Sequence, residues 1–229
     1  MSLLTPEETG AVLLSLKVAA AATVVSLPAA LAMAWLLARR RFPGRALVDA
    51  LIHLPLVLPP VATGYILLVL FGHQGSIGRV LDAVGLSVAF RWTGAALAAG
   101  VMAFPLMVRP IRLSIEAIDP EVDDAARSLG AGPLARLWRV TLPLAGPGLI
   151  AGAVLGFARA LGEFGATITF VAAIPGETLT LPTAIYQATQ SPEGEGRAVV
   201  LCAISAVIAV SAVLVGETLS ARAAERRKR

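Results

Sequence analysis

The sequence has few of the residues that usually carry catalysis or metal binding. Its 229 residues include one cysteine, Cys202, and two histidines, His53 and His73. A single cysteine excludes a disulfide within the chain, and so few thiol and imidazole groups predict no metal site. The phosphate-binding pattern G-x-x-x-x-G-K-[ST] is also absent. We therefore predict that the chain is not an enzyme by itself and has no ATP site.

Charged residues are scarce as well. They make up 15% of the chain, whereas 57% of residues are hydrophobic and the mean hydropathy is +0.79. Soluble domains have about 25% charged residues, so this composition indicates a membrane protein with several spans. The net charge of +4 does not indicate nucleic-acid binding, because the basic residues cluster at the ends of apolar runs.

Five apolar stretches reach the roughly 20 residues that a helix needs to cross a bilayer. They are Ala11–Ala38, Ala46–Phe71, Trp92–Leu113, Leu142–Ala172 and Ala198–Leu219. A further segment, Leu179–Gln187, is too short to cross and contains threonine and proline, which predicts a re-entrant or surface helix. We expect one all-α transmembrane domain over residues 1–229 with about five spans.

The basic residues also predict the orientation. Fourteen of them follow the first span, lie in or just before residues 114–141, or end the chain, against four on the opposite side. Since cytoplasmic loops carry the excess of arginine and lysine, the amino terminus is expected outside and the carboxyl terminus in the cytoplasm. The outer loops would be Gly72–Arg91 and Pro175–Arg197.

A polar insert between the third and fourth spans is therefore expected to be cytoplasmic. Asp119 and Pro120 are typical of a helix start, and Gly130-Ala-Gly132-Pro133 of a helix end. A second short helix is expected over Leu134–Val140, with Pro143 at the entry to the fourth span. This helix–turn–helix suits docking to a partner protein, but an amphipathic connector resting on lipid explains the pattern equally well.

The spacing within the insert resembles the signature of ABC importer permeases, Glu-Ala-Ala, three residues, Gly, nine residues, Ile-x-Leu-Pro. Here Asp124-Ala125-Ala126 is followed at the same spacing by Gly130 and by Val140-Thr141-Leu142-Pro143. The resemblance implies that residues 116–142 couple the chain to a separate ATPase subunit, which binds ATP and Mg²⁺. The residues implicated are Asp124, Ala125, Ala126, Arg127, Leu129, Gly130, Leu142 and Pro143.

Three further stretches resemble one group of these permeases in particular, namely residues 39–72, 104–119 and 158–186. They include "HLPLVLPPVATG", "FPLMVRPIRLSIEAID" and "ARALGEFGATITF", and they are similar to the molybdate permease subunits of bacterial type I importers, in the shorter form with an external amino terminus. This implies a homodimer in the inner membrane, two ATPase subunits and an external or lipid-anchored oxyanion-binding protein. The expected cargo is molybdate or tungstate, and the related sulfate and thiosulfate permeases are the alternative.

Arg159 and Glu163 lie four residues apart within the fourth predicted span, on one helical face. Charges at that depth are costly, so they predict either an aid to a passing oxyanion or an ion pair that holds helices together. We favour the ion pair.

Small residues recur every four positions before this pair, at Gly148, Gly152 and Gly156. This stripe predicts close helix packing, and it would also line the pathway if the packed partner were a second copy of the chain. Pro59 and Pro60 in the second span are candidates for a pathway or gate, because prolines free backbone groups there.

Two other classes of protein fit less well. An ion-coupled secondary transporter usually has inverted repeats, which five spans cannot supply as an even pair. An intramembrane enzyme needs a nucleophile with its base or a metal with its ligands, and neither set is recognisable.

Overall fold

The computed structural model describes residues 4–192 and 194–228, and the regular secondary structure of this part is helical throughout. In chain order the helices are α1 (Pro6–Arg39), α2 (Arg45–Val57), α3 (Pro60–Phe71), α4 (Ser76–Ala83), α5 (Trp92–Glu116), α6 (Pro120–Ser128), α7 (Pro133–Arg136), the π-helix η1 (Leu137–Thr141), α8 (Leu142–Leu144), α9 (Gly146–Leu161), α10 (Gly165–Val171), α11 (Leu181–Thr189) and α12 (Glu195–Lys228). The predicted all-α class is confirmed.

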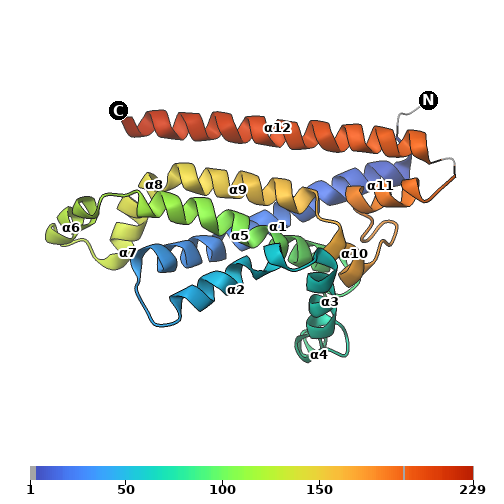
Figure 1. The fold of residues 1–229 in the computed structure, drawn as a ribbon, viewed down its shortest axis with the longest axis horizontal. Coiled ribbons are helices and arrows are strands. Elements are labelled where there is room, and N and C mark those ends of the chain that lie inside the picture. Colours follow the sequence, from blue (N-terminus) through green and yellow to red (C-terminus); the bar gives the residue numbers. More distant parts are fainter. Residues whose placement is uncertain (1–3, 193, 229) are drawn as a thin grey trace.

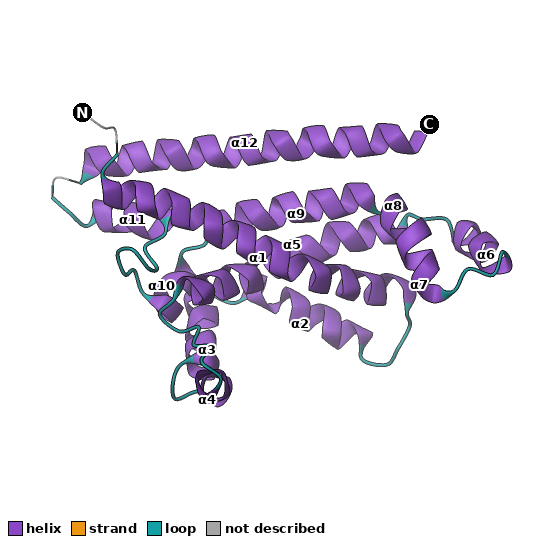
Figure 2. Cartoon of the chain, turned by 180° about the vertical axis from the view of Figure 1, so that it is seen from behind, coloured by secondary structure: helices purple, strands orange, loops and turns teal. Residues whose placement is uncertain are grey.

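Three of these helices are long and apolar enough to cross a membrane unbroken, namely α1, α5 and residues 195–220 of α12. Figures 1 and 2 show α1, α5 and α9 side by side, with α12 along the outside of α9. The α1–α5 contact is rich in fully buried alanines, among them Ala19, Ala34, Ala95 and Ala99. Small side chains let helix backbones approach closely, which is how helices associate where lipid removes the hydrophobic driving force.

The second predicted span, Ala46–Phe71, is not one helix, which corrects the sequence prediction. It breaks between α2 and α3, whose axes differ by 112°, and α3 points away from the bundle in Figure 1. Leu58 and Pro59 are extended, with ψ of 145° and 133°. The residue before a proline avoids the α region of backbone conformation. Because Pro59 and Pro60 are consecutive, this restriction applies to both Leu58 and Pro59.

The fourth predicted span, Leu142–Ala172, is also broken, at two places. The helical run that ends at Leu144 meets α9 at an angle of 71°, and residues 162–164 separate α9 from α10. The first break lies between Pro143 and Pro147, which lack the backbone N–H that a continuous helix needs. The membrane-crossing count is thus three unbroken helices, or five if each bent pair crosses once.

The two ends of the bundle differ in what they carry. The start of α1 lies at the end that holds α10 and α11, whereas α12 finishes at the opposite end, which also holds α6 and α7 (Figure 1). Helix α11 covers most of the predicted segment Leu179–Gln187 and packs against α1 and α12. Its first backbone N–H, that of Leu181, donates to the Ser15 hydroxyl at 2.6 Å, so this short helix is fixed to the bundle.

Candidate functional site

The polar insert forms α6, a glycine turn and α7. Asp119 caps α6 by accepting a hydrogen bond from the Glu121 N–H at 3.0 Å. The turn occurs at Gly130, whose φ of +80° lies in the left-handed region that glycine adopts without strain. Both features were predicted from the sequence.

The second helix of the insert differs from the prediction. It was expected over Leu134–Val140, but α7 ends at Arg136 and continues through η1 into α8 without a gap, so Pro143 lies inside the helical run. The π-helix has i→i+5 hydrogen bonds and so holds more residues per turn than an α-helix, and the bend of 71° follows it, at Ala145. Arg136 also forms an ion pair with Asp123 of α6, with 3.0 Å between Nη1 and Oδ2. This pair fixes the two helices of the insert to each other.

The insert presents large apolar side chains outside the bundle. No residue of α6 is buried, and the exposed fractions of Leu129, Leu134 and Trp138 are 88%, 68% and 64%. Of the implicated motif residues, Ala126 and Leu142 are half-buried, while the others (Asp124, Ala125, Arg127, Leu129, Gly130 and Pro143) are exposed. Exposed apolar groups on a surface projection mark a contact with another protein or with a membrane. We call residues 119–141 the docking knob.

Arg159 and Glu163 are in contact, with Arg159 Nη1 2.6 Å from Glu163 Oε2. That oxygen makes no well-directed hydrogen bond, so the contact is an ion pair held mainly by charge. The other oxygen, Oε1, accepts the Ala166 N–H at 2.8 Å and thereby caps α10. The Glu163 side chain is 1% exposed and that of Arg159 26%. The carboxylate thus joins the end of α9 to the start of α10.

Helix α10 in turn holds α3. Gly64 of α3 lies so close to the backbone of Ala166 that a methyl group there would overlap it. Phe71 and Phe170 add an edge-to-face contact with ring centres 6.5 Å apart. The orientation of α3, which begins at Pro60, therefore depends on α10, the helix that Glu163 caps.

The glycine stripe of α9 faces α5 of the same chain. Methyl groups added at Gly148, Gly152 and Gly156 would meet Ser114 and Pro110, Met107 and Ile111, and the Met107 side chain, respectively. Within the chain, the stripe thus packs against α5, and these glycines allow the two helices to approach closely.

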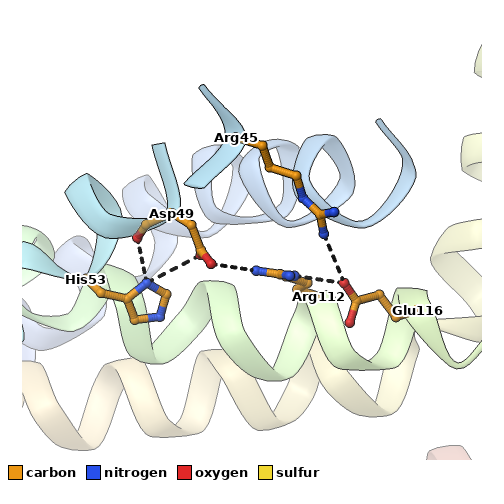
Figure 3. A network of polar contacts seen from close by, with 5 residues as sticks. All are labelled: Arg45, Asp49, His53, Arg112 and Glu116. Atoms are coloured by element: carbon orange, nitrogen blue, oxygen red, sulfur yellow. Dashed lines mark hydrogen bonds and ion pairs between the residues drawn. The ribbon is translucent and has the colours of Figure 1, made fainter. Parts of the chain in front are cut away.

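A charged network that the sequence analysis missed joins α2 to α5 (Figure 3). Arg112 Nη1 lies 3.1 Å from Asp49 Oδ2, and Arg112 Nε lies 2.8 Å from Glu116 Oε1. His53 donates to the Asp49 carbonyl at 2.8 Å, and Arg45 lies 3.7 Å from Glu116. Asp49 with His53, and Arg112 with Glu116, each lie four residues apart, which was the only available signal in the sequence.

At the other end of the molecule, His73 and Asp82 join the two sides of the turn around α4. The His73 Nδ1–H donates to Asp82 Oδ2 at 2.7 Å. This hydrogen bond holds the pKa of the Asp82 carboxyl below its ordinary value of 3.8.

A helical membrane bundle with an exposed knob between two of its helices defines the class of protein. The chain belongs to the binding-protein-dependent transport system inner membrane components, a family that matches residues 26–227. It is a permease subunit, a multi-pass protein of the inner membrane.

Individual permeases are similar to the chain to different degrees. The chain is 55% identical to the molybdenum transport system permease protein ModB of Escherichia coli (strain K12), over 98% of both chains. It is 39% identical to the sulfate transport system permease protein CysT of Salmonella typhimurium (strain LT2), over 79% of this chain and 66% of that protein. A solved bacterial ABC transporter that imports the acidic polysaccharide alginate contains a chain with a TM-score of 0.74 at 18% identity, covering 96% of this chain and 80% of that one. This last likeness shows the shared fold.

Proposed function

We propose that the chain is the membrane-spanning subunit of an ATP-driven importer that moves molybdate, and also tungstate, into the cytoplasm. The observation that carries this proposal is the 55% identity to a molybdenum permease across 98% of both chains. The sulfate permease is less similar and matches a smaller part of each chain. Sulfate is therefore the second candidate cargo.

The docking knob is proposed to bind a separate ATPase subunit, which holds the ATP and Mg²⁺. Its exposed Leu129, Leu134 and Trp138 offer an apolar surface suited to a groove in a partner. The knob follows α5 directly and leads through η1 and α8 into α9. Since α5 and α9 pack closely along the glycine stripe, a force on the knob would act on both helices together.

Transport is proposed to occur by alternating access in a homodimer of this chain, with two ATPase subunits on the cytoplasmic side and an oxyanion-binding protein outside. The amino terminus would lie outside and the knob inside, as the distribution of arginine supports. In this mechanism the buried carboxylate of Glu163 and its partner Arg159 hold α9, α10 and α3 in fixed positions relative to one another. No tight anion site is needed in the permease, because a pathway that held the anion strongly would release it slowly.

The test is reconstitution of the chain with the ATPase and binding protein encoded beside it. ATP hydrolysis and uptake into liposomes are measured with molybdate, tungstate and sulfate in turn. Stimulation by molybdate and tungstate but not by sulfate supports the proposal. Stimulation by sulfate alone would transfer the chain to the second candidate, and a chain that binds no ATPase and moves no anion would contradict the importer function.

A further inference from the structure

A basic cavity lies between the carboxyl end of α1 and the docking knob. Its volume is about 370 Å³, and its ionisable lining residues are Arg39 at the end of α1, the following Arg40, and Asp123, Arg127 and Arg136 of the knob. Trp35 and the buried Thr141 complete the polar part of the wall. A cavity of this size accommodates a small organic group.

The charges in this cavity do not balance. Four guanidinium groups face one carboxylate, and that carboxylate, Asp123, already pairs with Arg136. Among the residues that the structure describes, no carboxylate lies within ion-pair distance of Arg39, Arg40 or Arg127. An anion that entered the cavity would therefore meet a strong excess of positive charge.

Arg136, which lines this cavity, has one buried donor that lacks an acceptor among the described residues. Arg136 Nε is shielded from solvent and makes no hydrogen bond within the described part of the chain, although Nη1 of the same group binds Asp123. Buried polar groups are nearly always paired, because an unmade hydrogen bond costs its full desolvation. Because Nε is shielded, an anion in the cavity would meet the rest of the Arg136 guanidinium together with Arg39, Arg40 and Arg127, and guanidinium groups are suited to tetrahedral oxyanions such as phosphate.

The surroundings favour a phosphate that belongs to a lipid. The cavity lies at the arginine-rich end of α1, a 34-residue helix that is long enough for this end to leave the hydrocarbon core. Trp35 has the amphipathic ring that is enriched at this level, and Arg40 lies over it, 5.7 Å from the ring centre. Basic pockets at the cytoplasmic ends of spans are known to hold anionic headgroups.

We propose that this cavity binds the phosphate group of an anionic phospholipid and that the bound headgroup joins α1 to the docking knob. Of the coupling residues, Arg127 lines the cavity, whereas the exposed apolar side chains of Leu129, Leu134 and Trp138 do not. The cavity and the apolar docking surface can therefore be occupied at the same time, so a lipid here would remain in the assembled transporter.

The test measures binding of short-chain phosphatidylglycerol to the full chain assembled with its ATPase, by native mass spectrometry in detergent. Arg136→Gln and Arg40→Gln are expected to weaken binding about tenfold each, as the loss of one charge-assisted hydrogen bond would. Arg79→Gln, which changes an exposed arginine on α4, is the matched control and leaves binding unchanged.

Asp123→Asn separates binding from folding of the knob. It breaks the same ion pair as Arg136→Gln, but it removes the only negative charge from the cavity. If the cavity holds a phosphate, this variant retains or strengthens lipid binding. If Arg136 matters only for the shape of the knob, Asp123→Asn weakens binding as Arg136→Gln does, and the proposal fails.

Three further results would overturn the lipid assignment. One is lipid binding by Arg136→Gln and Arg40→Gln equal to that of the unmodified chain. Another is displacement of the lipid by millimolar inorganic phosphate or molybdate, which would make the cavity a site for soluble oxyanions. The third is loss of the lipid when the ATPase binds, which would assign the cavity to an acidic group of that partner.

Discussion

Arg112 of α5 lies 3.1 Å from Asp49 of α2, although 63 residues separate them in the chain. The same guanidinium reaches Glu116, the last residue of α5, just before the docking knob begins. Helix α2 makes few other contacts with the bundle and leads into the bend before α3. The pair therefore links the helix that carries the knob to the one that carries the bend.

We expect Arg112 and Asp49 to be energetically coupled. Both side chains are partly exposed, at 24% and 36%, so their coupling should be only about 1 kcal/mol. A double-mutant cycle with Arg112→Gln and Asp49→Asn, followed by thermal unfolding in detergent, measures it. Strictly additive losses would show that the contact contributes nothing to stability.

The glycine stripe predicts a ranking of substitutions. Gly148→Ala places a methyl group against the Pro110 carbonyl and Ser114, which cannot move easily, whereas Gly156→Ala meets only the flexible Met107 side chain. Gly148→Ala should cost about 1–3 kcal/mol of unfolding free energy and Gly156→Ala less. Gly146→Ala, which has open space around it, is the control. The reverse ranking would contradict the packing of α9 on α5.

Arg159 and Glu163 predict an asymmetry between single variants. Arg159→Gln leaves an unpaired carboxylate that is 1% exposed and should cost about 3 kcal/mol or more. Glu163→Gln should cost less, because Arg159 reaches solvent and the amide oxygen still caps α10. The double variant should recover part of the loss in both stability and uptake. If it regains stability but no uptake, Arg159 acts on the passing anion instead.

Much of the fold is readable from the sequence, but the places where helices break are not. Asp119 and Gly130 specify the start and end of α6 because capping and left-handed turns are local properties. Pro59 and Pro60 were assigned to a continuous span, since a proline either kinks or ends a membrane helix according to what surrounds it. Here Gly64 allows α3 to pack against α10, a contact between residues about 100 positions apart.

Contacts between charged residues could also be predicted only where the two residues are close in the sequence. The Arg159–Glu163 pair was predicted from its four-residue spacing and forms although Glu163 lies just past the end of α9, whereas the contact between Asp49 and Arg112 requires knowing that α2 lies along α5. The capping of α10 by Glu163 was also missed, because the break between α9 and α10 was not expected.

The turn around α4 should open only in acid. The pKa of Asp82 is lowered by its hydrogen bond from His73, so the folded state favours the carboxylate. The stabilisation is complete above the unfolded pKa and is lost as the pH falls through the lower folded pKa. Hydrogen exchange of the α4 amides, corrected for intrinsic rates, should increase below about pH 4. Asp82→Asn should remove that increase, and an increase retained in this variant would exclude Asp82 as the cause.

The most direct test of the account concerns Gly130, in the turn of the docking knob. Gly130→Asp adds bulk and charge at a left-handed position that has open space around it, so it should disturb docking without changing membrane insertion. Gly85→Asp is the matched control, since Gly85 has a φ of +74° and open space but lies near α4, at a distance from the knob in sequence. The account predicts that Gly130→Asp inserts normally but loses ATPase co-purification and molybdate uptake, while Gly85→Asp keeps the ATPase. Normal ATPase binding and uptake in Gly130→Asp would contradict the assignment of the knob as the coupling element.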